Sequence, residues 1–168
     1  MEKVKIGIVG LGRLGKRHAF NLANLVPKAN LQAVCSLNEA ELEWAKKELE
    51  TPQLFLSFED MLAHADIDAV WIASSSVFHA SQAKTALEHG FHVFVEKPMG
   101  VTLQECAEIE HAVQNHQDQV FLVGFVRRFD PSYRYAKELV ATGAIGTPFL
   151  VRSQTCDLDE YAEFQLEF

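Results

Sequence analysis

Apolar residues occur along this chain in short continuous runs that alternate with stretches of helical periodicity. Residues 4–9 form the first run, and apolar positions then recur at helical spacing through residues 13–26, until Pro27 ends the pattern. The same succession repeats as far as residue 126. It predicts strands at 4–9, 31–35, 53–58, 68–73, 91–96 and 119–126, and helices at 13–26, 39–49, 59–64, 77–89 and 102–116.

Continuous apolar runs, rather than runs in which every second residue is apolar, are typical of strands buried on both faces of a parallel sheet. Strands that alternate with helices through right-handed crossovers form a doubly wound α/β sheet of the Rossmann kind. We therefore predict a dinucleotide-binding Rossmann domain over residues 1–126.

The pattern changes after residue 126. Residues 127–146 predict a loop and one helix, and residues 147–157 alternate in the manner of a further strand. We interpret residues 127–168 as the start of a second, α+β domain that is incomplete in this sequence.

The turn after the first predicted strand reads Gly-Leu-Gly-Arg-Leu-Gly, residues 10–15, and fits the dinucleotide-binding pattern G-x-G-x-x-G. In that pattern Gly10 permits a tight turn, Gly12 lets the backbone approach a pyrophosphate, and Gly15 lets the helix pack on the strand. The free N–H groups of the following helix favour phosphate. A plain tight turn is the alternative, but the position between strand and helix favours dinucleotide binding.

The end of the second strand departs from this pattern. An acidic residue about 20 positions after the turn normally binds the ribose 2′-hydroxyl of NAD, and that position holds Ser36. Serine does not repel a 2′-phosphate, yet no arginine stands nearby to bind one. Lys46 and Lys47 come later, and Glu39 and Glu41 are acidic. The sequence favours NAD and leaves NADP open.

The fifth predicted strand ends in Glu96, Lys97 and Pro98. Ligands of open α/β sheets bind beyond the carboxyl ends of the strands, so Lys97 is placed at the cleft. A lysine there can orient a substrate hydroxyl and assist the loss of its proton as hydride departs. A solvated lysine at a strand end is the alternative that position alone leaves open.

Three segments, "GLGRLGKRH", "FVEKP" and "VGFVRRFDPSY", together resemble the GFO/IDH/MocA oxidoreductase family, most closely its inositol 2-dehydrogenase branch. Members oxidise a ring hydroxyl of a sugar or cyclitol with a nicotinamide cofactor. The resemblance implies a catalytic role for Lys97, which contacts both substrate and cofactor. It also implies cofactor contacts from Gly10, Gly12, Arg13, Leu14, Ser36, Ser74, Ser75, His79, Glu96, Pro98 and Arg127.

In the resembled family, a second domain carries substrate specificity, forms oligomers and supplies an aspartate and a histidine that act with the lysine. The sequence contains no segment that matches that motif. We therefore expect a polyol or sugar dehydrogenase that is a homo-oligomer. The alternative is a truncated, non-catalytic nucleotide-binding module, or a subunit completed by another chain.

Charge and cysteine content exclude other classes. The formal net charge of −8 disfavours nucleic acid and anionic membranes as partners, and no apolar run reaches the roughly 18 residues that span a bilayer. Cys35, Cys106 and Cys156 are odd in number and widely spaced, and the histidines lack metal-ligand spacing. We expect a cytoplasmic protein without a metal.

Overall fold

The computed structural model of the protein describes residues 2–50 and 53–154. The chain divides into two compact units, residues 1–125 and residues 126–168, and each is described by itself. Within the described ranges, no helix combines the length and the apolarity that crossing a bilayer requires.

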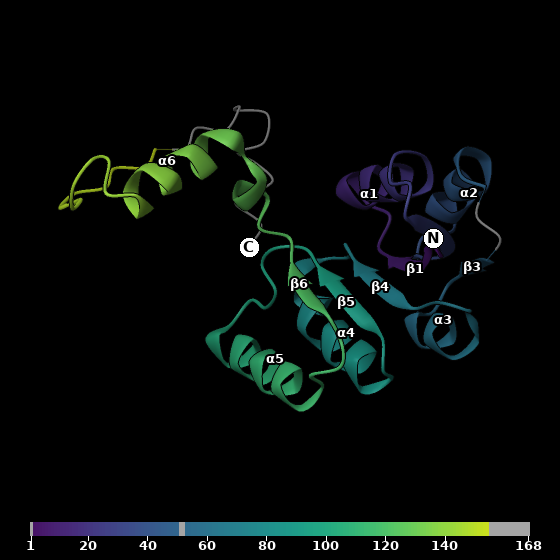
Figure 1. The fold of residues 1–168 in the computed structure, drawn as a ribbon. Coiled ribbons are helices and arrows are strands. Elements are labelled where there is room, and N and C mark those ends of the chain that lie inside the picture. The colour runs from purple at the N-terminus through teal and green to yellow at the C-terminus, as the bar shows by residue number, and fades with distance from the viewer. Residues whose placement is uncertain (1, 51–52, 155–168) are drawn as a thin grey trace. The chain divides into compact units, whose positions relative to one another are not determined.

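The first unit is a parallel sheet covered by helices on both faces (Figure 1). Its six strands lie in the order β3-β2-β1-β4-β5-β6, and every neighbouring pair is parallel. The strands are β1 (Val4–Val9), β2 (Ala29–Cys35), β3 (Gln53–Phe55), β4 (Ala69–Ile72), β5 (His92–Val95) and β6 (Phe121–Val123). The helices are α1 (Arg13–Asn24), α2 (Glu39–Glu48), α3 (Phe58–His64), α4 (Ser76–Glu88) and α5 (Leu103–Asn115). The predicted doubly wound fold is confirmed.

The strand order reverses between β1 and β4. The chain first builds outward from β1 to β2 and β3, then crosses back to place β4 on the other side of β1. Such a reversal opens a crevice beyond the carboxyl ends of the two central strands, because the connections on either side run in opposite directions. The turns after β1 and β4 therefore border the crevice.

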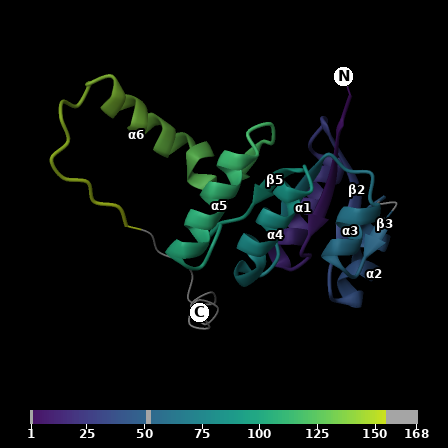
Figure 2. The same cartoon turned by 90° about the horizontal axis from the view of Figure 1, so that it is seen from below.

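Two apolar clusters hold the helices against the sheet. On one face, Ala19 and Leu22 of α1 and Leu42 of α2 pack against the fully buried Ile8. On the other face, Met61 of α3 and Leu87 of α4 belong to a second buried cluster. Figure 2 shows the sheet from the side of α3, α4 and α5. The continuous apolar runs of the sequence thus supply both faces of the sheet.

The predicted third strand, residues 53–58, is shorter than expected. β3 ends at Phe55, and Ser57 then caps α3 by accepting a hydrogen bond from the amide of Asp60 at 3.2 Å. Phe58 is the first residue of that helix and is buried in the core. The expectation was wrong because the capping serine ends the strand and begins the helix.

The second unit contains a short 3₁₀ helix (Val126–Phe129) and helix α6 (Pro131–Ala141). Asp130 caps α6 through the amides of Ser132 and Tyr133, and Pro131 occupies its first turn. The predicted strand at 147–157 is wrong for residues 147–154, which form no strand, and its remainder lies outside the described residues. Alternating polarity alone does not make a strand, because a strand also needs a neighbouring strand that completes its backbone hydrogen bonds.

Candidate functional site

The turns after β1 and β4 are in direct contact at the carboxyl edge of the sheet. Gly10 has a φ of +88°, and a Cβ at this position would lie 2.4 Å from the backbone nitrogen and Cα of Ser74. The amide of Gly10 also donates to the carbonyl of Cys35 at the end of β2, at 2.9 Å. Only glycine fits here without displacing the neighbouring backbone.

The other two glycines of the turn differ in what surrounds them. A Cβ on Gly15 would lie 2.0 Å from the carbonyl oxygen of Gly10, so this glycine lets α1 approach the turn. A Cβ on Gly12 would meet nothing within 4 Å. Gly12 therefore borders open space at the start of α1, where a pyrophosphate can reach the backbone. The turn fits a dinucleotide.

Two helices at this edge begin without a side-chain cap. Neither Gly12 before α1 nor Ser75 before α4 forms a side-chain cap hydrogen bond. Among the α-helices of the described ranges, the other four all have one, from Asn38, Ser57, Thr102 and Asp130. The N-termini of α1 and α4, at the reversal of strand order, are thus not capped by the side chains of their N-cap residues, as is usual where a helix N-terminus binds an anion.

His79 links the turn after β4 to the turn after β5. The ring is buried; its Nδ1 lies 2.7 Å from the carbonyl oxygen of Pro98 and its Nε2 3.0 Å from that of Ser74. The hydroxyl of Ser74 donates to Gln82 at 2.6 Å. The cofactor contacts of Ser74, Ser75 and His79 stay predictions, and the structure adds that His79 connects the two turns.

Glu96, directly after β5, is held by a residue that the sequence interpretation did not assign to the site. Its Oε1 lies 2.9 Å from Nε2 of His18, which belongs to α1, and its Oε2 accepts from the amide of Lys97 at 3.1 Å. Burial opposes ionisation of Glu96, but the hydrogen bonds and the charges of His18 and Lys97 outweigh it and lower the pKa of the carboxyl.

Aromatic rings pack against the His18 ring that contacts this carboxylate. His18 lies with its ring centroid 5.3 Å from that of Trp71, and Trp71 stacks on Phe94 at 3.7 Å. Trp71 and Phe94 face each other from the adjacent strands β4 and β5. Lys97 itself is exposed, and its peptide bond to Pro98 is cis. The glycine turn, His18 and the Lys97 turn are therefore brought to one edge of the sheet.

Ser36 lies at the end of β2, where an acidic residue is usual. It is buried, and its hydroxyl donates to Oε2 of Glu41 at 2.5 Å. The amide of Asn38 donates in turn to the Ser36 oxygen at 3.1 Å. The sequence offered one signal for this contact: an N-cap residue followed by glutamate three positions later turns the glutamate back toward the start of its helix.

Arg127 belongs to the second unit, so its predicted cofactor contact stays a prediction. Its guanidinium donates to the hydroxyl of Tyr133 and lies over the Tyr133 ring, 5.1 Å from the centroid. Within the described ranges, no three His, Cys, Asp or Glu residues come together in a way that could hold a metal ion.

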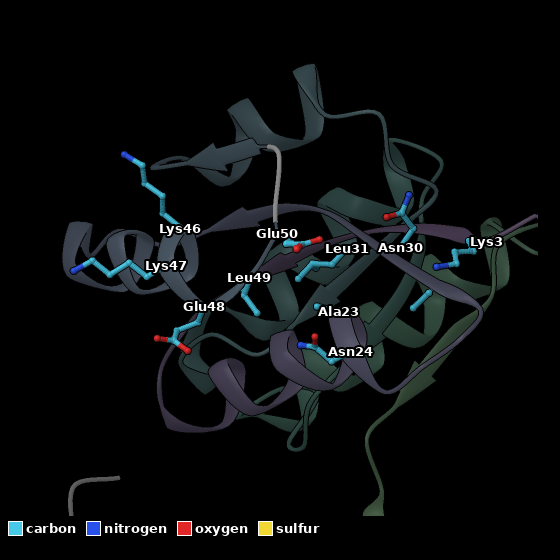
Figure 3. Close-up of a pocket in the computed structure, with 11 residues that line it drawn as sticks. Lys3, Ala23, Asn24, Asn30, Leu31, Lys46, Lys47, Glu48, Leu49 and Glu50 are labelled. Atoms are coloured by element: carbon cyan, nitrogen blue, oxygen red, sulfur yellow. The ribbon is translucent and has the colours of Figure 1, made fainter.

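A cavity of about 600 Å³ lies at the amino ends of the strands, away from the glycine turn (Figure 3). The side chains of Lys46 and Lys47 point outward from it. We assign no function to this cavity. It is lined by Lys3, Ala23, Asn24, Ala29, Asn30, Leu31, Lys46, Lys47, Glu48, Leu49 and Glu50.

A doubly wound sheet with a glycine turn at its reversal point and uncapped helix N-termini beside it defines a dinucleotide-binding Rossmann domain. More narrowly, the chain belongs to the GFO/IDH/MocA family: the model described as an oxidoreductase family with an NAD-binding Rossmann fold matches residues 4–125. The predicted family and the predicted cofactor, NAD, are confirmed.

Relatives of the chain include dehydrogenases of inositols. The scyllo-inositol 2-dehydrogenase (NAD(+)) of Bacillus subtilis is 35% identical over 93% of this chain and 45% of its own length. Inositol 2-dehydrogenase of Salmonella typhimurium is 31% identical over 96% of this chain and 48% of its own. A crystal structure of scyllo-inositol dehydrogenase from Lactobacillus casei, with bound cofactor NAD(H) and scyllo-inositol, matches with a TM-score of 0.93 and 48% identity, over 99% of this chain and 49% of that one. The chain spans about half the length of these relatives.

Proposed function

We propose that this chain is the nucleotide-binding part of a dehydrogenase that moves a hydride between a nicotinamide cofactor and a ring hydroxyl of inositol or a related polyol. Family membership supports the oxidoreductase chemistry. The substrate class is supported by the inositol dehydrogenases among the relatives and by the 48% identity to a structure with bound NAD(H) and scyllo-inositol.

The contact between His18 and Glu96 is the observation that carries this proposal. His18 lies one turn into the helix that opens at Gly12, and Glu96 immediately precedes Lys97, 78 residues further along the chain. The 2.9 Å contact ties the helix expected to bind the pyrophosphate to the turn that presents the amine. Both parts of the proposed chemistry thus share one edge of one sheet.

Each part of the site has a distinct proposed role. Gly12 and the first amides of α1 would hold the pyrophosphate, and the turn at Ser74 and Ser75 would line the nicotinamide half. When bound, the nicotinamide accepts the hydride. The ammonium of Lys97 would donate a hydrogen bond to the substrate hydroxyl, orient it and stabilise its oxygen as the proton passes to a base, which in the resembled family is the histidine of the second domain. Glu96 accepts a hydrogen bond from the Lys97 amide and so fixes the start of that turn.

The remaining expectations also belong to this proposal. We propose cofactor contacts from Arg13, Leu14, Pro98 and Arg127, with the boundary between the cofactor and substrate domains at residues 126 and 127. We further propose that the protein assembles as a homo-oligomer. These assignments are supported by the family resemblance of the sequence motifs.

Replacing Lys97 by Ala tests the proposal. NADH binding is followed by its fluorescence, and turnover by inositol-dependent formation of NADH. We expect Lys97→Ala to abolish turnover in a complete form of the enzyme, since Lys97 is proposed to act on the substrate hydroxyl, while leaving NADH affinity within about threefold of the wild type. Lys47→Ala, which removes an exposed lysine from α2, is the control and should change neither quantity.

The outcomes separate the proposal from its alternatives. Near-normal turnover in Lys97→Ala would contradict the role of Lys97. Absence of NADH binding by the wild-type chain would contradict nucleotide binding altogether. NADH binding without inositol-dependent turnover by the wild-type chain would instead favour a nucleotide-binding module, or a subunit completed by another chain.

A further inference from the structure

We propose that Glu41 is the residue that selects NAD over NADP, by binding the 2′-hydroxyl of the adenosine ribose and repelling a 2′-phosphate. The inference rests on the proposed nucleotide binding and adds a residue that does not stand at the usual acidic position. The usual acidic residue is expected at the end of the second strand, and Ser36 stands there instead. Glu41 comes from the helix that follows.

The end of β2 lies beside the glycine turn. The amide of Gly10 donates to the carbonyl of Cys35 at 2.9 Å, and Ser36 is the next residue. A dinucleotide whose pyrophosphate lay at Gly12 would extend its adenosine half toward Ser36, because β2 neighbours β1 on that side of the sheet. The ribose would then lie at the end of β2, where Ser36 and its hydrogen-bond partner stand.

Hydrogen bonds bring the Glu41 carboxylate to this position. Asn38 caps α2 by accepting from the amide of Ala40 at 3.0 Å, which places Glu41 in the first turn of the helix. The carboxylate then turns back, and its Oε2 accepts from the Ser36 hydroxyl at 2.5 Å. The Ser36 oxygen is itself fixed by the amide of Asn38. Glu41 is half-buried, whereas Glu39 and Glu43 on the same helix are exposed.

The hydrogen-bonding capacities of the two side chains decide their roles. Ser36 has one hydroxyl proton, which it donates to Glu41, so it has none left for a ligand. A carboxylate accepts at both of its oxygens. Ser36 engages Oε2 of Glu41, and Oε1 provides an acceptor for a ribose hydroxyl. Ser36 is thus a positioning residue, and Glu41 makes the contact with the cofactor.

Charge then gives the selectivity. A 2′-phosphate at this position would meet the negative charge of Glu41 at short range, and like charges in a half-buried site repel strongly. The lysines of α2 do not offset that charge. Lys46 and Lys47 lie in the last turn of the helix, beside the cavity at the opposite edge of the sheet, and their side chains point outward from it (Figure 3).

The test compares the affinities of NADH and NADPH, measured by calorimetry, in the wild-type chain and in Glu41→Gln. We expect the wild type to prefer NADH. In Glu41→Gln we expect weaker NADH binding and stronger NADPH binding, so that the ratio of the two dissociation constants changes by about tenfold or more, which corresponds to about 1.4 kcal/mol. Glu43→Gln makes the same change of charge on an exposed residue of α2 and should leave the ratio within about twofold.

Two further variants keep the inference testable if Glu41→Gln folds poorly. Ser36→Ala removes the hydrogen bond that holds the carboxylate and should reduce the preference for NADH in the same direction. Ser36→Asp added to Glu41→Gln returns an acid to the usual position and should restore the preference. Circular dichroism confirms that each variant is folded before its affinity is compared.

Specific results would overturn the inference. A wild type that binds NADPH as tightly as NADH contradicts the role of Glu41 while leaving the proposed dehydrogenase function intact. Equal changes in Glu41→Gln and Glu43→Gln would mean that only the overall charge of the helix matters. A wild type that binds neither nucleotide overturns the proposed function, and this inference with it.

Discussion

The glycines of the turn after β1 should separate into one that serves binding and one that serves folding. Substitution by alanine at Gly12 and at Gly15 adds the same methyl group three residues apart. At Gly12 the new Cβ meets nothing within 4 Å, whereas at Gly15 it would lie 2.0 Å from the carbonyl oxygen of Gly10. We expect Gly12→Ala to lose nucleotide affinity in a stable protein, and Gly15→Ala to lose stability.

The magnitudes follow from this geometry. Gly12 has φ −62° and ψ −172°, a conformation open to alanine. Alanine at position 12 restricts the unfolded chain and so stabilises the folded protein by about 0.4–1 kcal/mol. Loss of glycine at an N-cap costs a similar amount, about 0.5–1 kcal/mol. The free energy of unfolding of Gly12→Ala should therefore be close to that of the wild type. At Gly15 the backbones must separate by about 1.4 Å or more to reach an ordinary contact. Overpacking of this kind costs about 1–3 kcal/mol or more.

Urea unfolding followed by circular dichroism measures the stability of each variant, and NADH fluorescence measures its affinity. For Gly12→Ala we expect an unchanged unfolding midpoint and an NADH affinity reduced at least about tenfold, since the methyl group occupies space at the proposed pyrophosphate position. For Gly15→Ala we expect a lower midpoint with an unchanged slope. Undiminished NADH affinity in Gly12→Ala, or equal destabilisation of the two variants, would refute this reasoning.

Two other predictions concern side chains whose pKa the fold changes. The lowered pKa of Glu96 means that its charged form stabilises the fold. At neutral pH the free energy of unfolding of the wild type should therefore exceed that of Glu96→Gln by about 1.5–3 kcal/mol. This difference should fade as the pH drops from about 4.3 through the pKa of Glu96 in the folded protein. Urea unfolding across this pH range measures it, and a difference that grew in acid would contradict the assignment. Burial, together with the negative charges of Glu59 and Asp60, raises the pKa of Cys35 to about 12. In a variant with Cys106→Ser and Cys156→Ser, the remaining Cys35 thiol should therefore react with Ellman's reagent at pH 8 only after unfolding. Rapid labelling of the native protein would disprove this.

The order of elements in the first unit could be predicted because local patterns determine it. Short apolar runs and helical periodicity gave the alternation of strands and helices, and the glycine pattern indicated a dinucleotide-binding turn after β1. The boundary at residues 53–58 was wrong because the capping signal at Ser57 was not weighed against the apolar run. Where one residue ends a strand and begins a helix, composition alone does not locate the change.

Contacts across the chain were the part that the sequence did not reveal. His18 and Glu96 are 78 residues apart, and no periodicity links a histidine in a helix to a carboxylate at the end of a distant strand. Glu41 was noted only as an acidic neighbour, although its position three residues after Asn38 indicated that its side chain turns back. The predicted strand at 147–157 depended on a neighbouring strand, which local sequence cannot supply.

The buried ring of His79 has a mechanical consequence. This rigid, planar group contacts two backbone carbonyls, at Ser74 and at Pro98, and so links the loops that follow β4 and β5. A ligand that displaced the first loop would therefore also shift the second loop and, with it, the amine of Lys97 that we propose acts on the substrate. We expect ligand binding in the crevice and the position of that amine to be coupled through His79.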